Sequence, residues 1–153
     1  MHVETFDERH LGDAVPLFAD VFSAPPWSEY WPLDEARSRI QEVRASIGGR
    51  GWVAIDDGLV GFALGYEVVT PEGQAAFLLH EMAVRRDRQC QGAGSMLLRA
   101  LEHDVAAGGL ECVEVLTAAG KYPCYFYEKN GYEVVRAPTA GVIVLGRAVE
   151  VTP

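Results

Sequence analysis

The sequence predicts a single α/β domain built on a mixed β-sheet. Segments in which apolar and polar residues alternate, as in strands, are interspersed with segments of helical periodicity. Two of the strand-like segments flank an Asp-Gly turn, and a strand–helix–strand unit occupies residues 75–116. A chain of 153 residues is long enough to bury one hydrophobic core and is close to the usual size of one domain. We therefore predict one domain over residues 1–153.

The first third of the chain is predicted to hold one strand and two helices. Alternation of polar and apolar residues indicates a strand over His2–Phe6. Apolar residues at helical spacing indicate helices over Glu8–Phe22 and Leu33–Ile47. Pro16 lies inside the first of these helices, where a proline is expected to cause an irregularity. Residues 23–32, between the helices, form a loop rich in proline and aromatic side chains.

The rest of the chain supplies the other six predicted strands and two helices. In chain order they are strands over Trp52–Ile55, Leu59–Val69 and Ala75–Val84, a helix over Gly94–Ala107, a strand over Cys112–Leu116, a helix over Lys121–Asn130, and strands over Tyr132–Val135 and Val142–Val149. Because a helix connects the strands over 75–84 and 112–116, these two strands must run parallel to each other.

Charge and composition exclude several classes of protein. The chain has 13 basic and 22 acidic residues, a formal net charge of −9, which disfavours nucleic acids and anionic membranes and attracts cations. The longest apolar stretch, residues 58–66, is far shorter than the ~20 residues of a membrane span. The first eight residues do not resemble a secretion signal, and the three cysteines lack metal-ligand spacing. We expect a cytoplasmic protein with reduced cysteines and no metal.

The most informative segment follows the predicted strand that ends at Val84. Gly92 and Gly94 lie where this strand gives way to a helix. Glycine allows positive φ and close approach of backbone N–H groups to a ligand, and a helix N-terminus adds unpaired donors and partial positive charge. The segment therefore predicts a cradle for a pyrophosphate, although a tight turn would also explain the glycines. Ser95 lacks the preceding lysine of a Walker loop, and Leu97 stands where a dinucleotide fingerprint has its third glycine.

Two linked motifs resemble one family. Gln89-x-x-Gly92-x-Gly94 resembles the coenzyme A loop of the GNAT N-acetyltransferases, and Phe126-Tyr127-Glu128-Lys129-Asn130-Gly131-Tyr132 is similar to that family's closing Phe-Tyr-Glu-Lys-x-Gly-Phe. One helix and one strand separate the motifs, as the family requires, and the detailed resemblance spans residues 78–132. It implies a GNAT-like fold, with a mixed central sheet of about seven strands and about four flanking helices, and an acetyl-coenzyme A-dependent N-acetyltransferase.

The resemblance also implies where the co-substrate binds. The backbone of Met82 and Val84 would pair with pantetheine like an added strand, and the N–H groups of residues 89–94 would hold the pyrophosphate. A bulge that splays this strand from its parallel neighbour would free N–H groups for the thioester oxygen. The implied cofactor-binding residues are Met82, Ala83, Val84, Gln89, Cys90, Gln91, Gly92, Ala93, Gly94 and Ser95. Three nearby arginines would meet the nucleotide phosphates or form a solvated turn: Arg85, Arg86 and Arg88.

His80 and Glu81 are the candidate bases, because the attacking amine must lose a proton. Regular alternation would place His80 on the same strand face as Met82 and Val84, toward the acetyl group, and histidine has suitable basicity for a proton relay. Glu81 could act as the base through a water molecule or anchor the substrate ammonium. A hydrogen-bonded core histidine and a solvent-facing glutamate would explain the same two residues.

Tyr127 is the candidate acid. It stands where the resemblance places the catalytic tyrosine of the family. A phenol with a pKa of about 10 can donate a proton to a leaving thiolate whose thiol has a pKa of about 8.5. A purely structural tyrosine would fit the sequence as well.

The loop over 27–31 lies between the first two helices, where the resemblance implies the acceptor cleft. Trp27, Glu29 and Tyr30 are the candidate substrate-binding residues, because exposed aromatic rings beside a carboxylate suit a cation. Packing of the two tryptophans against the protein would explain the loop too. Glu29, Asp34 and Glu35 are expected to border the cleft, with Glu81 near its floor; acidity that serves only solubility is the alternative.

The predicted reaction is transfer of acetyl to a primary amine of a small, cationic molecule, by direct attack through a tetrahedral intermediate. A protein or peptide N-acetyltransferase and a non-catalytic acyl-coenzyme A-binding module are the alternatives. The apolar segment Val142–Leu145 also predicts a final strand that pairs with a second copy of the chain in a homodimer.

Overall fold

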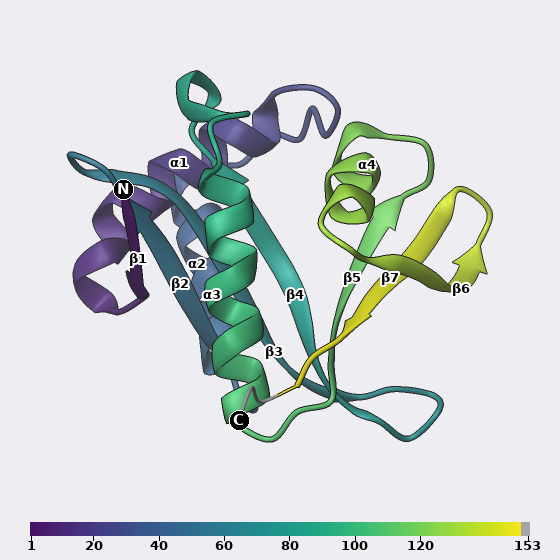
Figure 1. The fold of residues 1–153 in the computed structure, drawn as a ribbon. Helices are drawn as coiled ribbons and strands as arrows, with labels where there is room; N and C mark the ends of the chain where they lie inside the picture. The colour runs from purple at the N-terminus through teal and green to yellow at the C-terminus, as the bar shows by residue number, and fades with distance from the viewer. Residues whose placement is uncertain (151–153) are drawn as a thin grey trace.

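A seven-stranded mixed sheet carries the fold, with helices on both of its faces (Figure 1). The computed structural model describes residues 1–150, so the last three residues of the predicted domain lie outside the described residues. The elements are β1 His2–Thr5, α1 Leu11–Ser23, α2 Leu33–Ala45, β2 Arg50–Ile55, β3 Leu59–Val69, β4 Ala75–Val84, α3 Ala93–Ala107, β5 Cys112–Ala118, α4 Tyr122–Lys129, β6 Glu133–Thr139 and β7 Val142–Ala148, with short 3₁₀ turns at Glu8–His10 and Arg86–Arg88.

The predicted fold class is confirmed, and the elements differ from the predictions mainly at their ends. The first helix starts with a 3₁₀ turn, because Asp7 and His10 form a reciprocal capping box there and α1 itself begins only at Leu11. Pro16 lies inside α1 without ending it; the hydrogen bond it removes would have reached Gly12, near the helix start. None of the described helices is long and apolar enough to cross a membrane.

Two hydrophobic clusters lie on opposite faces of the sheet. On one face, α3 buries the four residues predicted to point inward, Leu97, Leu98, Leu101 and Val105, and α4 contributes Cys124 and Tyr127 to the same cluster. On the other face, α1 and α2 pack on β3 through side chains that include Phe18, Ile40 and Phe62. The core therefore fixes both the helix that follows the glycine loop and the helix that carries Tyr127.

Strands β4 and β5 run parallel, as the crossover predicts, but they pair over only part of their length. The pairing joins residues 76–79 of β4 to residues 112–115 of β5. Beyond Leu79, β4 stays paired with β3 alone, and the two halves of the sheet diverge toward the end that carries α4 (Figure 1). The register of β3 and β4 shifts at the same point, because His80 is an extra residue opposite Leu64 and Gly65. The expected bulge and the expected splay are both present.

The predicted pairing of the final strand across a homodimer is wrong. The strand order is β1-β2-β3-β4-β5-β7-β6, so β7 has a hydrogen-bonded neighbour on each side. The segment 142–145 has no free edge for a second chain, and Val144 and Leu145 are buried. The apolar run is typical of an interior strand, and β6 is the edge strand at this end of the sheet.

Candidate active site

Gly92 and Gly94 are glycines for different structural reasons. Gly92 precedes α3 with φ of +95°, and a Cβ added there would meet no atom within 4 Å. The loop backbone is therefore open at Gly92, in a conformation that glycine adopts at no steric cost. A Cβ at Gly94 would lie 2.9 Å from the ring of Phe126 in α4, so close packing of the two helices explains Gly94.

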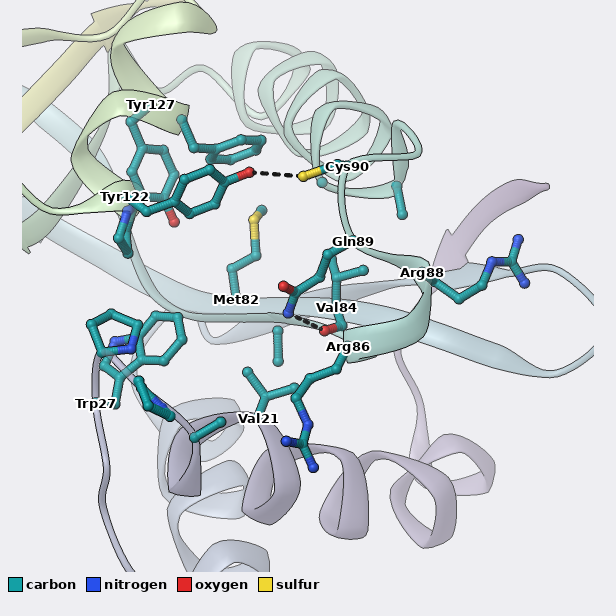
Figure 2. Close-up of a pocket in the computed structure, with 18 residues that line it drawn as sticks. Val21, Trp27, Met82, Val84, Arg86, Arg88, Gln89, Cys90, Tyr122 and Tyr127 are labelled. Carbon is teal, nitrogen blue, oxygen red and sulfur yellow. Dashed lines mark hydrogen bonds between the residues drawn. The ribbon is translucent and has the colours of Figure 1, made fainter.

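A cavity of about 290 Å³ lies beside this loop. Its walls are the end of β4, the loop, the first turn of α3, the segment 24–27 and α4. Figure 2 shows Tyr122 and Tyr127 on one side of the cavity, Trp27 on the other and Met82 between them. Seven of the residues implied in cofactor binding line it: Met82, Ala83, Val84, Gln89, Cys90, Ala93 and Gly94. Gln91, Gly92 and Ser95 do not line it.

Polar contacts around this cavity involve the loop residues. Gln89 Nε2 donates to the carbonyl oxygen of Val84 at 3.0 Å, and Cys90 Sγ lies 3.5 Å from the hydroxyl of Tyr122 across the cavity (Figure 2). The three arginines beside the loop each pair with an aspartate: Arg85 with Asp87, Arg86 with Asp20 and Arg88 with Asp56. Arg86 and Arg88 line the cavity, but their charges are balanced within the protein.

A second cavity, of about 200 Å³, adjoins the first, and both are lined by Trp27, Met82, Pro123 and Tyr127. Its other walls carry polar side chains, among them Glu29, Arg39, His80 and Glu81. The largely apolar cavity beside the glycine loop and the second, charged cavity therefore meet at Met82 and Tyr127.

Glu81 lies almost fully buried in the wall of the second cavity. Its Oε1 accepts from Arg39 Nη1 at 3.2 Å and lies 3.1 Å from His80 Nδ1. Because a carboxylate only accepts, His80 donates from Nδ1 in this contact. Among the described residues, no side chain or backbone group hydrogen-bonds Glu81 Oε2.

The expectation that His80 shares a strand face with Met82 and Val84 is wrong. Met82 and Val84 pack against the cluster under α3, whereas the His80 ring lies 5.6 Å from the ring of Tyr66, which packs on the α1–α2 side. The bulge at His80 is the physical reason, because an extra residue breaks the period-2 alternation. His80 therefore stands beside Glu81 and does not line the cavity next to the glycine loop.

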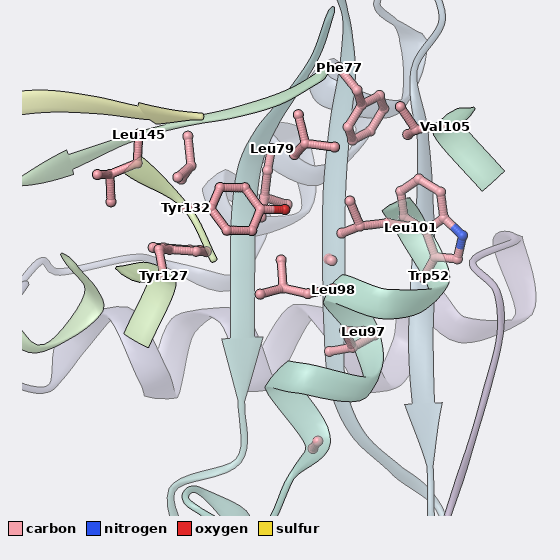
Figure 3. Close-up of a cluster of buried hydrophobic side chains, with 14 of the residues drawn as sticks. Trp52, Phe77, Leu79, Leu97, Leu98, Leu101, Val105, Tyr127, Tyr132 and Leu145 are labelled. Carbon is pink, nitrogen blue, oxygen red and sulfur yellow. The ribbon is translucent and has the colours of Figure 1, made fainter. Parts of the chain in front are cut away.

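Tyr127 is buried where the two cavities meet. Its ring packs edge-on against Phe126 at 5.2 Å and Tyr132 at 5.8 Å, and the Tyr132 hydroxyl donates to the buried Glu102 at 2.7 Å. Figure 3 shows Tyr127 and Tyr132 side by side in the cluster under α3. Burial raises the pKa of Tyr127 well above its ordinary value, and the negative charge of Glu81 raises it further. The hydroxyl is therefore protonated at every pH at which the protein would work.

The predicted acceptor loop is only partly at the site. Trp27 and Glu29 line the second cavity, while Tyr30 is 87% exposed and lines neither cavity. Asp34 and Glu35 are exposed on the first turn of α2 and also line neither. Sequence reasoning missed Arg39: it precedes the buried Ile40 on an otherwise polar helix stretch, and no local pattern distinguishes it from the exposed Arg37.

Comparison with known proteins identifies the class. The family model described as an acetyltransferase (GNAT) domain matches residues 48–134, more than half of the chain. The chain belongs to the GNAT family. It is an N-acetyltransferase whose co-substrate is acetyl-coenzyme A.

Solved structures agree on the fold. An aminoglycoside 6'-acetyltransferase type Ii is 25% identical, with a TM-score of 0.75 and 100% of both chains covered. An aminoglycoside 6'-N-acetyltransferase complexed with coenzyme A is 21% identical, with a TM-score of 0.76 and coverage of 100% of this chain and 99% of that one. The ribosomal-protein-S18-alanine N-acetyltransferase from Escherichia coli is 17% identical, with a TM-score of 0.72 and coverage of 99% and 95%. A comparison with curated protein sequences gives no match.

We expect Gly92→Val to weaken acetyl-coenzyme A binding by roughly tenfold or more, because a β-branched residue is strained at positive φ and its side chain would fill the open space beside the loop backbone. Cys90→Ala, which leaves the loop backbone as it is, should change the affinity little. Titration calorimetry with acetyl-coenzyme A measures both variants, and thermal unfolding verifies that both are folded. Equal affinities would show that the loop backbone does not hold the phosphates.

Proposed function

We propose that this N-acetyltransferase acetylates the primary amine of a small, cationic molecule by direct attack on the thioester, through a tetrahedral intermediate. The observation that carries the proposal is the junction of the two cavities at Met82 and Tyr127. One cavity has the glycine loop in its wall, and the other has the carboxylates of Glu29 and Glu81. A donor and an amine that enter from opposite sides would meet beside a tyrosine hydroxyl.

The first cavity fits acetyl-coenzyme A, which supplies the acetyl group as a thioester. The backbone at Gly92 is open and α3 begins at the next residue, so the first N–H groups and the positive end of this helix would be available to an incoming pyrophosphate. Beyond Leu79, β4 has no partner on its β5 side, which leaves an edge along which an extended pantetheine chain can lie. Met82 and Val84 are on this part of the strand.

Glu81 is the residue best placed to act on the acceptor. One carboxylate oxygen is held by Arg39 and His80, and the other has no partner among the described residues. A carboxylate in that state can hold the substrate ammonium and accept its proton, directly or through a water molecule. In this proposal His80 is a hydrogen-bond partner of Glu81 and not the base, because the bulge turns it away from the donor cavity.

Tyr127 serves the leaving group in this proposal. Its hydroxyl is protonated throughout the working pH range and stands at the junction of the cavities. A hydrogen bond from the phenol would stabilise the thiolate as the carbon–sulfur bond breaks. Because the pKa of the phenol exceeds that of the thiol, complete transfer of the proton to the thiolate is unfavourable. We therefore assign the hydroxyl a hydrogen bond that stabilises the thiolate without complete proton transfer.

Charge supports a cationic acceptor. The second cavity holds two carboxylates against one guanidinium, and the three arginines near the first cavity are already paired with aspartates. The protein as a whole carries −9. Two of the similar structures are aminoglycoside acetyltransferases, and this likeness adds support for an amine with several positive charges.

The test is thiol release with a panel of amines at low and high ionic strength. The panel comprises butylamine, putrescine, spermidine, kanamycin, glutamate and a short peptide with a free N-terminus. We expect catalytic efficiency to rise by roughly tenfold or more from butylamine to spermidine or kanamycin, and salt to reduce that difference. Efficiency that ignores charge and salt, or that favours glutamate, would contradict a cationic acceptor. Preference for the peptide would favour a protein N-acetyltransferase instead.

A further inference from the structure

Arg39 links the acceptor loop to the strand bulge. It lies on α2, and its side chain lines the second cavity with 37% of its surface exposed. The guanidinium carbon stands 5.0 Å from the centre of the Trp31 ring, and Nη1 donates to Glu81 Oε1 at 3.2 Å. The same guanidinium therefore contacts the loop on one side and the buried carboxylate on the other.

We propose that Arg39 is a positioning residue that fixes the Glu81 carboxylate, so that its free oxygen faces the acceptor amine. The inference rests on the proposed function, since it assigns Arg39 a role through Glu81. Arg39 and His80 both contact Oε1, and Oε2 has no hydrogen-bond partner among the described residues. Two contacts on one oxygen restrict rotation of a flexible side chain before substrate binds, which reduces the entropy lost later.

The position of Arg39 is itself fixed by the core. Trp31 packs edge-on against the buried Phe18 at 5.0 Å, and its indole N–H donates to Glu29 Oε1 at 3.4 Å. A guanidinium over an indole face is a favourable cation–π contact, and the planar arginine head suits it better than lysine. The aromatic ring therefore supports Arg39 from the side opposite Glu81, and the loop, α2 and the bulge act as one unit.

Stability alone does not explain this ion pair. Arg39 is partly exposed, so water competes for its charge and the pair adds little to folding. Glu81 in contrast is 9% exposed and lies in the wall of the second cavity. A weak contribution to folding, combined with contact to the buried carboxylate in the wall of the second cavity, is what a positioning role predicts.

The experiment compares Arg39→Gln with Arg37→Gln. Both variants lose one positive charge from α2, but Arg37 is exposed and lines neither cavity. With spermidine and kanamycin as acceptors, we expect Arg39→Gln to lower kcat/KM for the amine by roughly 10–100-fold, the cost of a misplaced group. Acetyl-coenzyme A affinity by calorimetry and the midpoint of thermal unfolding should match those of Arg37→Gln.

A double-mutant cycle with Glu81→Gln tests whether Arg39 acts through Glu81. We expect Arg39→Gln to have no further effect on kcat/KM once Glu81 is replaced. Losses that add would overturn the proposal, as would an Arg39→Gln enzyme equal to Arg37→Gln, or one whose loss comes from weaker acetyl-coenzyme A binding or a lower unfolding midpoint. If the wild type acetylates neither amine, the proposed function fails and this inference fails with it; if the wild type is active, only the inference is at stake.

Discussion

Tyr127→Phe is expected to lower turnover by about 10²–10⁴-fold, the range for loss of a group that serves a leaving atom, and to leave acetyl-coenzyme A affinity unchanged. The phenol stands where the two cavities meet, and its hydroxyl hydrogen-bonds no group among the described residues. Removing the oxygen therefore takes away a free donor without breaking an internal contact. The ring contacts with Phe126 and Tyr132 remain. Steady-state kinetics and calorimetry measure the two quantities.

Tyr125→Phe is the matched control, because Tyr125 is on the same helix, 59% exposed and outside both cavities. It should behave as wild type. The pH dependence adds a second check. Because its pKa is raised, Tyr127 stays protonated in the alkaline range of the assay, and ionisation of this phenol should not lower wild-type activity there. Undiminished turnover of Tyr127→Phe would mean that the residue is structural or that water protonates the thiolate.

Most of the fold could be predicted from the sequence because each element has a strong local signal. The α3 segment places Leu97, Leu98, Leu101 and Val105 at helical spacing, and all four are buried. The Asp-Gly turn fixes the β2–β3 hairpin, and the crossover from β4 through α3 requires a parallel β5. The glycine loop and the segment 126–132 add two motifs in the right order, and the family match confirms the family that they resemble.

The features that could not be predicted depend on contacts between distant segments. The bulge that turns His80 away from Met82 is set by the pairing of β4 with β3, and nothing at residue 80 itself signals an extra residue. The place of β7 inside the sheet depends on β6 folding back beside it. The role of Gly94 depends on Phe126, 32 positions later in the chain. Arg39 and Glu81 are 42 positions apart in the chain, and they are in contact only because α2 packs against the sheet.

Glu81→Gln is expected to lower kcat/KM for the amine by about 10²-fold or more, because glutamine cannot accept the proton that the substrate ammonium must lose to become the attacking amine. The amide is nearly the same shape as the carboxylate, and its oxygen can still accept from Arg39, so the wall of the second cavity should keep its form. Acetyl-coenzyme A affinity should stay at the wild-type value, since Glu81 does not line the cavity beside the glycine loop. Kinetics with spermidine and kanamycin, together with calorimetry, give the comparison.

Glu35→Gln separates this effect from a general loss of negative charge. Glu35 is exposed on α2 and lines neither cavity, so the variant has the same net charge as Glu81→Gln without a change at the site. If attraction of the acceptor by the whole protein were decisive, both variants would lose similar small factors, and high salt would remove the difference from wild type. A base or anchor at Glu81 predicts a large loss in one variant alone, unchanged by salt. Full activity of Glu81→Gln would mean that water, and not Glu81, accepts the proton of the substrate ammonium.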